Sequence, residues 1–314
     1  MATTTTATTN FSSTVTADVK RRVLENLRAK HAHVMPGAFI PAAYQRGTNS
    51  FVYVTYPDLS AATTALTEGT PPTDNALSIS TESFSATQVG NTIAISDIAA
   101  LQSPHNLASI AAERLAENAA KTQDILVREI LAAGASVFYS GTATSRSTVA
   151  GTAILTGALV KRMVEELQAA NVPTFGNGRY RSVVHPRQAG DLQRDTSTAG
   201  YVDIFKANEQ ASNLTELRTA AYAGADFIIT SDAKVFATAG ASSANVYAAL
   251  FFGPEAYAVN DLQSLNAYLV PAGGDHSDPI AQKAIVGWKM AFGAKILTGP
   301  GAKIMRLETG STYG

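Results

Sequence analysis

The residues of this chain that could carry out chemistry are few and scattered. There are five histidines: His31, His33, His105, His185 and His276. The spacing of His31 and His33 could place two metal ligands on one side of a strand, but no carboxylate lies near them in sequence. Asp275-His276-Ser277-Asp278 follows two glycines and could bind a cation, although ordinary surface-turn chemistry explains the same residues. We therefore expect no metal site.

Other catalytic signatures are missing from the sequence. The chain has no cysteine, which excludes disulfides, thiolate metal sites and cysteine nucleophiles. It has no Gly-x-Ser-x-Gly nucleophile elbow and no dinucleotide-binding glycine fingerprint after a strand. The segment Gly299–Lys303 lacks the spacing, and the following Ser or Thr, of a phosphate-binding loop. We predict that the chain is not an enzyme and needs no cofactor, with an unrecognised hydrolase as the alternative.

The composition favours a protein with extensive subunit contacts. The chain has 314 residues, of which 46% are hydrophobic and 16% are charged, whereas soluble domains average about 25% charged. Interface cores are depleted in charge, so such a surface suits self-association. The net charge of −1 indicates neither nucleic acid nor membrane as a partner. No apolar run of about 18 residues and no signal peptide is present, so we expect synthesis in a cytoplasm.

A long stretch of one-signed charge predicts an extended arm. From Gly47 to Glu113 the chain has no lysine or arginine, but it contains the acids Asp58, Glu68, Asp74, Glu82, Asp97 and Glu113. Strand-like sequence at 51–56 leads through a turn-rich segment and returns as alternating sequence toward 93–95. An isolated two-stranded ribbon is marginal in water, and charge of one sign suits a basic surface on another molecule. A hairpin folded back on its own domain is the alternative.

Helical patterns lie on both sides of this ribbon. Apolar residues recur at intervals of three or four from 104 to 133, between Ser103-Pro104 and Gly134, which predicts a helix roughly 45 Å long. Residues 17–32 also read as an amphipathic helix. Its basic face could meet a packaged polyanion, a scaffold protein or a neighbour's acidic ribbon, and it carries Lys20, Arg21, Arg22 and Arg28.

The rest of the chain mixes short helices and strands, which indicates an α+β fold. We expect helices at 156–170 and 187–194, and a strand at 179–185 that leads into Pro186. A mobile segment is expected at 197–216. Further strands are expected at 227–230, at 246–259 with an interruption at Gly253-Pro254, and at 284–292, 295–297 and 303–307, with a short element at 261–269. The last strands are expected to return to the long helix.

The order of these elements resembles the HK97-type fold of tailed-phage major capsid proteins. Three local segments add to the resemblance, which covers nearly the whole chain. Thr67–Pro72 matches the place of that family's extended loop, the E-loop. Val183–Ala189 resembles the entry into its axial domain, and Leu297–Ile304 resembles the closing strands of one branch.

The resemblance implies a division of the chain and a function. Residues 1–47 would form the N-terminal arm, 48–100 the E-loop lying across the adjacent subunit, 101–179 and 276–314 the peripheral domain with its spine helix, and 180–275 the axial domain. The protein would assemble into pentamers and hexamers that close an icosahedral shell around double-stranded DNA. The partners would be copies of itself, a separate scaffold, a portal and a cement protein, with non-specific DNA contact and no membrane. The location would be the virion, after assembly in the host bacterial cytoplasm.

Under this resemblance the residues of interest make contacts. Candidates for pairing across subunits are Glu68, Asp74, Glu82, Arg179 and Arg181. Some capsids of this fold crosslink through an E-loop lysine, which this segment lacks, so no such isopeptide bond is expected. The alternatives are an encapsulin-like shell around protein cargo, and another virion component such as a tail tube or decoration protein, against which the long helix argues.

Overall fold

The computed structural model describes residues 32–34, 39–40, 43–44, 50–56, 59–63, 65, 68–69, 74–134, 136–196, 221–273, 280, 282–297 and 304–313. The predicted helix at 17–32, the segment at 197–216 and the polar loop at 275–278 lie almost wholly outside these ranges. The chain divides into two compact units. The first comprises Met1–Met35, Ala86–Ile130 and Val259–Ala294, and the second comprises Pro36–Ser85, Leu131–Ala258 and Lys295–Gly314.

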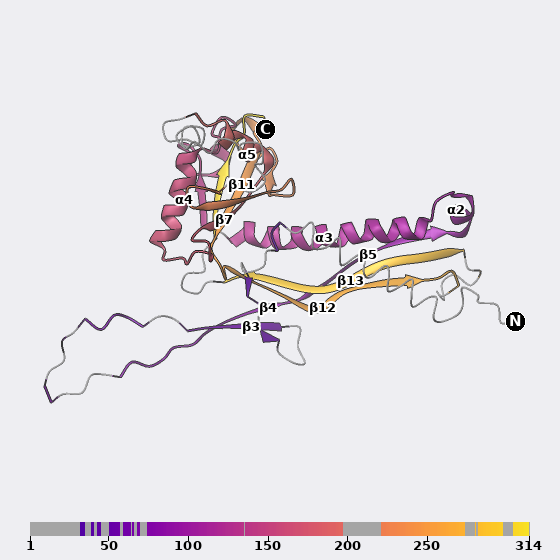
Figure 1. Cartoon of the computed structure of the whole chain (residues 1–314), viewed down its shortest axis with the longest axis horizontal. Coiled ribbons are helices and arrows are strands. Elements are labelled where there is room, and N and C mark those ends of the chain that lie inside the picture. Colours follow the sequence, from indigo (N-terminus) through magenta and orange to yellow (C-terminus); the bar gives the residue numbers. More distant parts are fainter. Residues whose placement is uncertain are drawn as a thin grey trace. The chain divides into compact units, whose positions relative to one another are not determined.

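A long helix and a sheet of long strands make up most of the first unit (Figure 1). Its three long strands have the order β12-β13-β5, with β5 at Thr87–Ser96, β12 at Tyr257–Val270 and β13 at Lys283–Ile296. β13 and β5 run antiparallel from Lys283↔Ser96 to Phe292↔Thr87. The short strand β1 (Phe39–Ile40) pairs in parallel with Tyr257 and Ala258 at the start of β12, and these four residues belong to the second unit.

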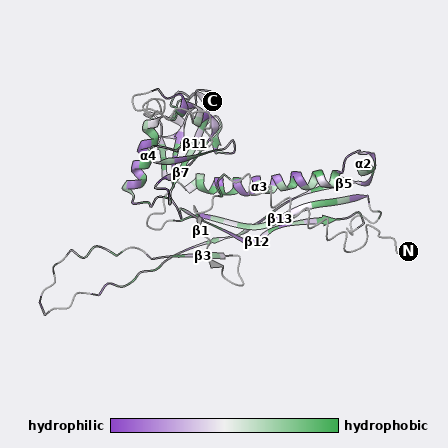
Figure 2. Ribbon diagram, in the orientation of Figure 1, coloured by the Kyte–Doolittle hydropathy of each residue, from purple (hydrophilic) through white to green (hydrophobic). Residues whose placement is uncertain are grey.

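The long helix α3 spans Leu107–Gly134, which is 28 residues and about 42 Å. It ends at the predicted glycine but starts later than predicted. Asn106 caps it by accepting from the backbone N–H of Ser109 at 3.2 Å. Ser103 instead caps the end of a separate short helix, α2 (Asp97–Gln102). Figure 2 shows apolar and polar residues alternating along α3, and its small buried alanines allow close packing.

The second unit is built on a seven-stranded mixed sheet in the order β6-β14-β11-β7-β9-β8, with β10 also paired to β11. The strands are β6 (Ser136–Tyr139), β7 (Tyr180–Val184), β8 (Ala221–Tyr222), β9 (Ala225–Ile229), β10 (Val235–Phe236), β11 (Val246–Phe252) and β14 (Ile304–Thr309). Short 3₁₀ turns lie at Arg146–Thr148 and Ala241–Ser243.

Helices α4 (Gly157–Ala169) and α5 (Pro186–Gln193) form the core of this unit together with the strands. Met163 and Leu167 of α4 pack in one apolar cluster with Phe251 and Leu307. α4 buries the 3–4-residue pattern that predicted it. α5 starts at Pro186, and His185 caps it by accepting from the N–H of Arg187 at 3.2 Å.

A three-stranded sheet completes the second unit, in the order β2-β3-β4, with β2 at Ala43–Tyr44, β3 at Ser50–Thr55 and β4 at Ser80–Ser85. β3 and β4 are antiparallel from Ser50↔Ser85 to Thr55↔Ser80. The ribbon was predicted to continue to 93–95. That part is wrong, because Ala86 ends β4 and residues 87–96 pair with β13 instead.

The C-terminal strands also differ from the prediction. β12 is one strand through 261–269, and β13 is one strand through 283–296. β13 reaches α3, since Trp288 donates its Nε1–H to Asn118 Oδ1 at 3.2 Å. β14 lies inside the seven-stranded sheet instead, between β11 and β6. Among the described residues, no helix is long and apolar enough to cross a membrane.

Candidate functional site

The ribbon begins as a well-packed pair of strands and continues as exposed chain. Phe51 is buried and its ring lies 5.3 Å from that of Phe84 on the opposite strand. Beyond the paired strands, every described residue from 59 to 79 is exposed. Large apolar side chains are among them, including Leu59, Leu77 and Ile79. An arm that exposes this much apolar surface has the character of a contact surface.

Two of the predicted contact acids lie on this arm. Glu68 and Asp74 are exposed, and within the described part of the chain neither makes an ion pair. Such carboxylates are sterically available to another molecule. Whether they pair across subunits stays a prediction.

The third acid, Glu82, is engaged within its own chain. Its side chain is only 11% exposed, and its Oε2 lies 3.5 Å from the Nζ of Lys295. Lys295 also donates to the carbonyl of Ser83 at 3.2 Å. Glu82 was predicted to pair with a neighbouring subunit; here it pairs with Lys295 of its own chain, and a contact across subunits stays a prediction. Burial, Glu255 and Glu82 together raise the pKa of the nearby Tyr53.

The two predicted arginines at the start of β7 also have partners within the second unit. Arg179 lies 3.5 Å from Asp226, whose carboxylate also accepts from Asn177. The guanidinium of Arg181 lies 4.3 Å from the centre of the Phe175 ring. Arg179 remains half exposed, so an additional contact across subunits stays a prediction. The basic residues Lys20, Arg21, Arg22 and Arg28 lie outside the described residues.

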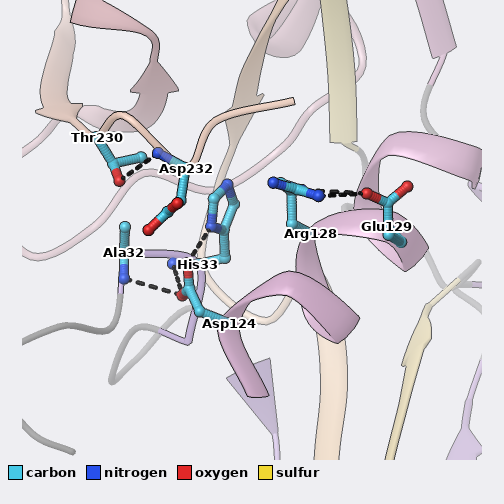
Figure 3. A network of polar contacts seen from close by, with 7 residues as sticks. All are labelled: Ala32, His33, Asp124, Arg128, Glu129, Thr230 and Asp232. Atoms are coloured by element: carbon cyan, nitrogen blue, oxygen red, sulfur yellow. Dashed lines mark hydrogen bonds and ion pairs between the residues drawn. The ribbon is translucent and has the colours of Figure 1, made fainter. Parts of the chain in front are cut away.

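A buried polar contact in the first unit was not predicted. Asp124 of α3 accepts from the backbone N–H groups of Ala32 at 2.9 Å and His33 at 2.6 Å, and contacts His33 Nδ1 at 2.7 Å (Figure 3). Burial acts to raise the pKa of Asp124, but the hydrogen bonds and charge of His33 outweigh it, so this pKa is lowered. The contact fastens the segment 32–34 to the long helix.

Metal binding at the histidines gains no support from this geometry. His33 is fully buried against Asp124, and His185 caps α5. Burial, with the charge of Arg187, lowers the pKa of His185. Among the described residues, no group of three or more His, Asp or Glu could hold an ion. His31 and His276 lie outside the described ranges.

A buried charge cluster in the second unit was also missed. Glu308 of β14 is fully buried and accepts two hydrogen bonds from Arg146, at 2.9 and 2.8 Å. Arg306, two residues before it, places its Nε 2.9 Å from the same carboxylate. Arg146 also lies over the Phe236 ring, 3.4 Å from its centre. Residues 306 and 308 share one face of a strand, which the sequence could indicate, but the partner at 146 could not be found from spacing.

The sheet of the first unit has one open, hollowed face. Trp288 and Val286 are buried, and Trp288 bonds to α3, so the alternate residues of β13 face the other way. A hollow of about 560 Å³ is lined by parts of β5, β12 and β13. Gly90 and Gly287 also line it, at positions where an added Cβ would come within 2.6 Å of the Trp288 carbonyl and 2.7 Å of Thr92 Cγ2, and Lys289 and Tyr268 complete that part of the lining.

Two surfaces of the described residues are open to other molecules, and two buried charge pairs hold segments of the chain together. The described residues combine an exposed acidic and apolar arm with a hollow sheet face that carries a lysine. Charge pairs are used to fasten segments together, as at Asp124 and Glu308.

Comparisons with known proteins agree on the fold. No protein-family model matches the chain, and no curated protein matches it. A chain of the cyanophage Pam1 capsid asymmetric unit is 15% identical, with 91% of this chain and 93% of that chain covered, at a TM-score of 0.71. A chain of the capsid of Ralstonia phage GP4 is 16% identical, with 84% of each chain covered, at a TM-score of 0.68. A virus-like particle from Pyrococcus furiosus is 13% identical, with 93% and 99% covered, at a TM-score of 0.52.

The fold therefore belongs to the class of α+β shell subunits that these assemblies use. It is the HK97-like fold of phage major capsid proteins, as the order of elements predicted. At identities this low the likeness is one of fold.

Proposed function

We propose that this chain is a tailed-phage major capsid protein that assembles into pentamers and hexamers and closes an icosahedral shell around double-stranded DNA. The observation that carries the proposal is the match along nearly the full length of both chains to the cyanophage capsid subunit. The exposed ribbon and the low content of charged residues support it, because both suit repeated subunit contacts.

The ribbon supplies the first contact between subunits in this proposal. It lies on the hollow sheet face of a neighbour, where Lys289 offers a positive charge to the arm's Glu68 and Asp74. The exposed side chains of Leu77 and Ile79 supply the apolar part of that contact. Each exposed ion pair contributes only about 0–1 kcal/mol, but the contact repeats at every subunit of a shell.

The partners and chemistry of the shell follow from the same proposal. A separate scaffold, a portal and a cement protein assist assembly in the bacterial cytoplasm, and the basic N-terminal residues contact the packaged DNA. No lysine lies between Gly47 and Glu113, so the subunits are not joined by ribbon isopeptide bonds. Assembled particles boiled in detergent should release single chains of 32.8 kDa, and a ladder of higher masses would contradict this.

The experiment that tests the function is electron microscopy of purified protein, beside size-exclusion chromatography. Closed shells, or rings of five and six subunits, are expected. A discrete monomer or dimer, both alone and after co-expression with the adjacent genes of its source genome, would overturn the proposal.

A shell around protein cargo is the second candidate, as an encapsulin-like compartment. It draws support from the match to the archaeal virus-like particle, which covers 99% of that chain. The higher TM-scores of the two phage capsids favour the capsid. Nuclease-protected DNA in particles from infected cells supports a capsid, whereas co-purifying protein cargo without DNA supports the compartment.

A further inference from the structure

The buried charge cluster around Glu308 holds two positive groups and one negative group. The guanidinium groups of Arg146 and Arg306 share the single carboxylate of Glu308. Both oxygens of that carboxylate already accept from Arg146, at 2.9 and 2.8 Å. Glu308 is fully buried, and the side chain of Arg306 is only 8% exposed. Because arginine is rarely buried unless it is fully paired, Arg306 calls for a second acceptor.

Both arginines have N–H donors that the folded chain does not use. The Nε of Arg306 lies 2.9 Å from Glu308 Oε1 but lacks the geometry of a hydrogen bond, and no described residue accepts from its Nη groups. Arg146 donates through Nε and Nη2, which leaves its Nη1 without an acceptor among the described residues. Unsatisfied donors on a buried side chain are exceptional in native structures.

The two guanidinium groups are fixed in position by their surroundings. Arg146 lies over the ring of Phe236, 3.4 Å from its centre, and Arg306 lies 5.6 Å from the centre of the same ring. Phe236 belongs to β10, which pairs with β11, and β11 also pairs with β14, the strand of Arg306. The donors are therefore held in place before anything binds to them, which favours binding.

The segments that build the cluster supply no further negative charge to balance it. In the 3₁₀ turn, β6, β10 with its flanks, β11 and β14, the described charged residues are Arg146, Asp232, Lys234, Arg306 and Glu308. Asp232 and Lys234 have opposite charges and further interactions within the chain, so one positive charge remains in excess. The pKa of Arg306 is lowered, because burial and the charge of Arg146 lower it by more than Glu308 raises it.

We propose that Arg146 and Arg306 form a binding site for one tetrahedral oxyanion of the phosphate class. The planar fork of a guanidinium matches the oxygen atoms of such an anion, and the oxyanion accepts from the N–H groups that Glu308 does not engage. Arg146 is one-third exposed and forms the outer side of the site. The anion adds the negative charge that Glu308 alone does not provide. This site goes beyond the proposed shell function, because it belongs to each folded subunit.

Calorimetric titration of the unassembled subunit with sodium phosphate tests the site directly, with sodium chloride at the same ionic strength as the reference. We expect saturable binding of one phosphate per chain in wild type and binding at least tenfold weaker in R306M. The matched control is R114M, which removes an arginine whose side chain is 71% exposed and should bind as wild type does. If R306M does not fold, R146M replaces it, since Arg146 is the more exposed of the two. No saturable binding in wild type, or wild-type binding in the folded variant, would overturn the proposal.

The substitution Glu308→Gln gives a test in the opposite direction. It removes the negative charge that competes for the same guanidinium groups, so phosphate should bind roughly tenfold more tightly than in wild type. Binding to the folded state alone raises stability, so phosphate should raise the urea midpoint of E308Q by more than that of wild type. The general stabilising effect of phosphate salts acts on both proteins alike. Equal rises in the two midpoints would therefore contradict the site.

The oxyanion site and the shell function can be overturned separately. Phosphate that does not bind would remove the site and leave the capsid proposal standing. Wild-type protein that forms no rings or shells would remove the capsid proposal, whereas the titration of the subunit would still decide whether Arg146 and Arg306 bind an oxyanion.

Discussion

The buried carboxylate of Glu308 provides the sharpest test of how the second unit is held together. Glu308 is fully buried and is the carboxylate that both Arg146 and Arg306 contact. The pKa of Arg306 is lowered, because burial and the charge of Arg146 lower it by more than the nearby Glu308 raises it. The substitution Glu308→Gln keeps the side-chain size but leaves the two guanidinium groups without their shared counter-charge.

The expected loss follows from the burial of the three groups. Removing one partner of a buried ion pair typically costs about 3–5 kcal/mol. Because Arg146 is one-third exposed and can turn toward water, we expect the lower end, about 3 kcal/mol. A loss of about 3 kcal/mol lowers the folding equilibrium constant roughly a hundredfold. In a domain of this size, each kcal/mol lost lowers the melting temperature by about 2–4 °C. High salt should not remove the effect, since buried pairs are poorly screened.

The assay is urea unfolding of the unassembled subunit, followed by the fluorescence of its tyrosines and tryptophan. The control is Glu117→Gln, which removes the exposed pair with Arg114 at 3.0 Å and should cost less than about 1 kcal/mol. If Glu308→Gln costs no more than Glu117→Gln, the cluster does not stabilise this unit and the reasoning fails.

Three further predictions concern Asp124 and the acids of the ribbon. The pKa of Asp124 is lowered in the folded chain, so its contribution to the stability of the fold is present above the ordinary carboxyl pKa and is lost as pH falls through the lowered value. The difference in unfolding free energy between wild type and Asp124→Asn should therefore be large at pH 7 and should disappear in strong acid. A difference that does not depend on pH would refute this. Replacing both Glu68 and Asp74 with lysine should impair shell assembly and leave the subunit folded, because both are exposed and unpaired among the described residues. Normal particles from this double variant would show that the acids of the arm are not needed for subunit contacts. Glu82→Lys should instead destabilise the subunit itself, through the lost pair with Lys295, as thermal unfolding can check.

Local sequence was sufficient to predict the elements whose signals are local. The 3–4-residue apolar spacing and Gly134 located most of the long helix. The strand before Pro186 located β7 and the start of α5. The order of these elements along the chain was enough to predict the HK97-like fold, because order is a property of the sequence itself.

Only the tertiary structure decided which strands pair and which charges meet. Residues 87–96 have the alternation of a ribbon strand, and alternation alone cannot choose between β3 and β13 as the partner. Glu82 looked like the other acids of its segment until Lys295, more than 200 residues later, was placed beside it. The contact of Asp124 with residues 32 and 33 and the cluster around Glu308 likewise join residues that are far apart in the chain. Their pairing depends on distance in space, which residue types and spacing do not encode.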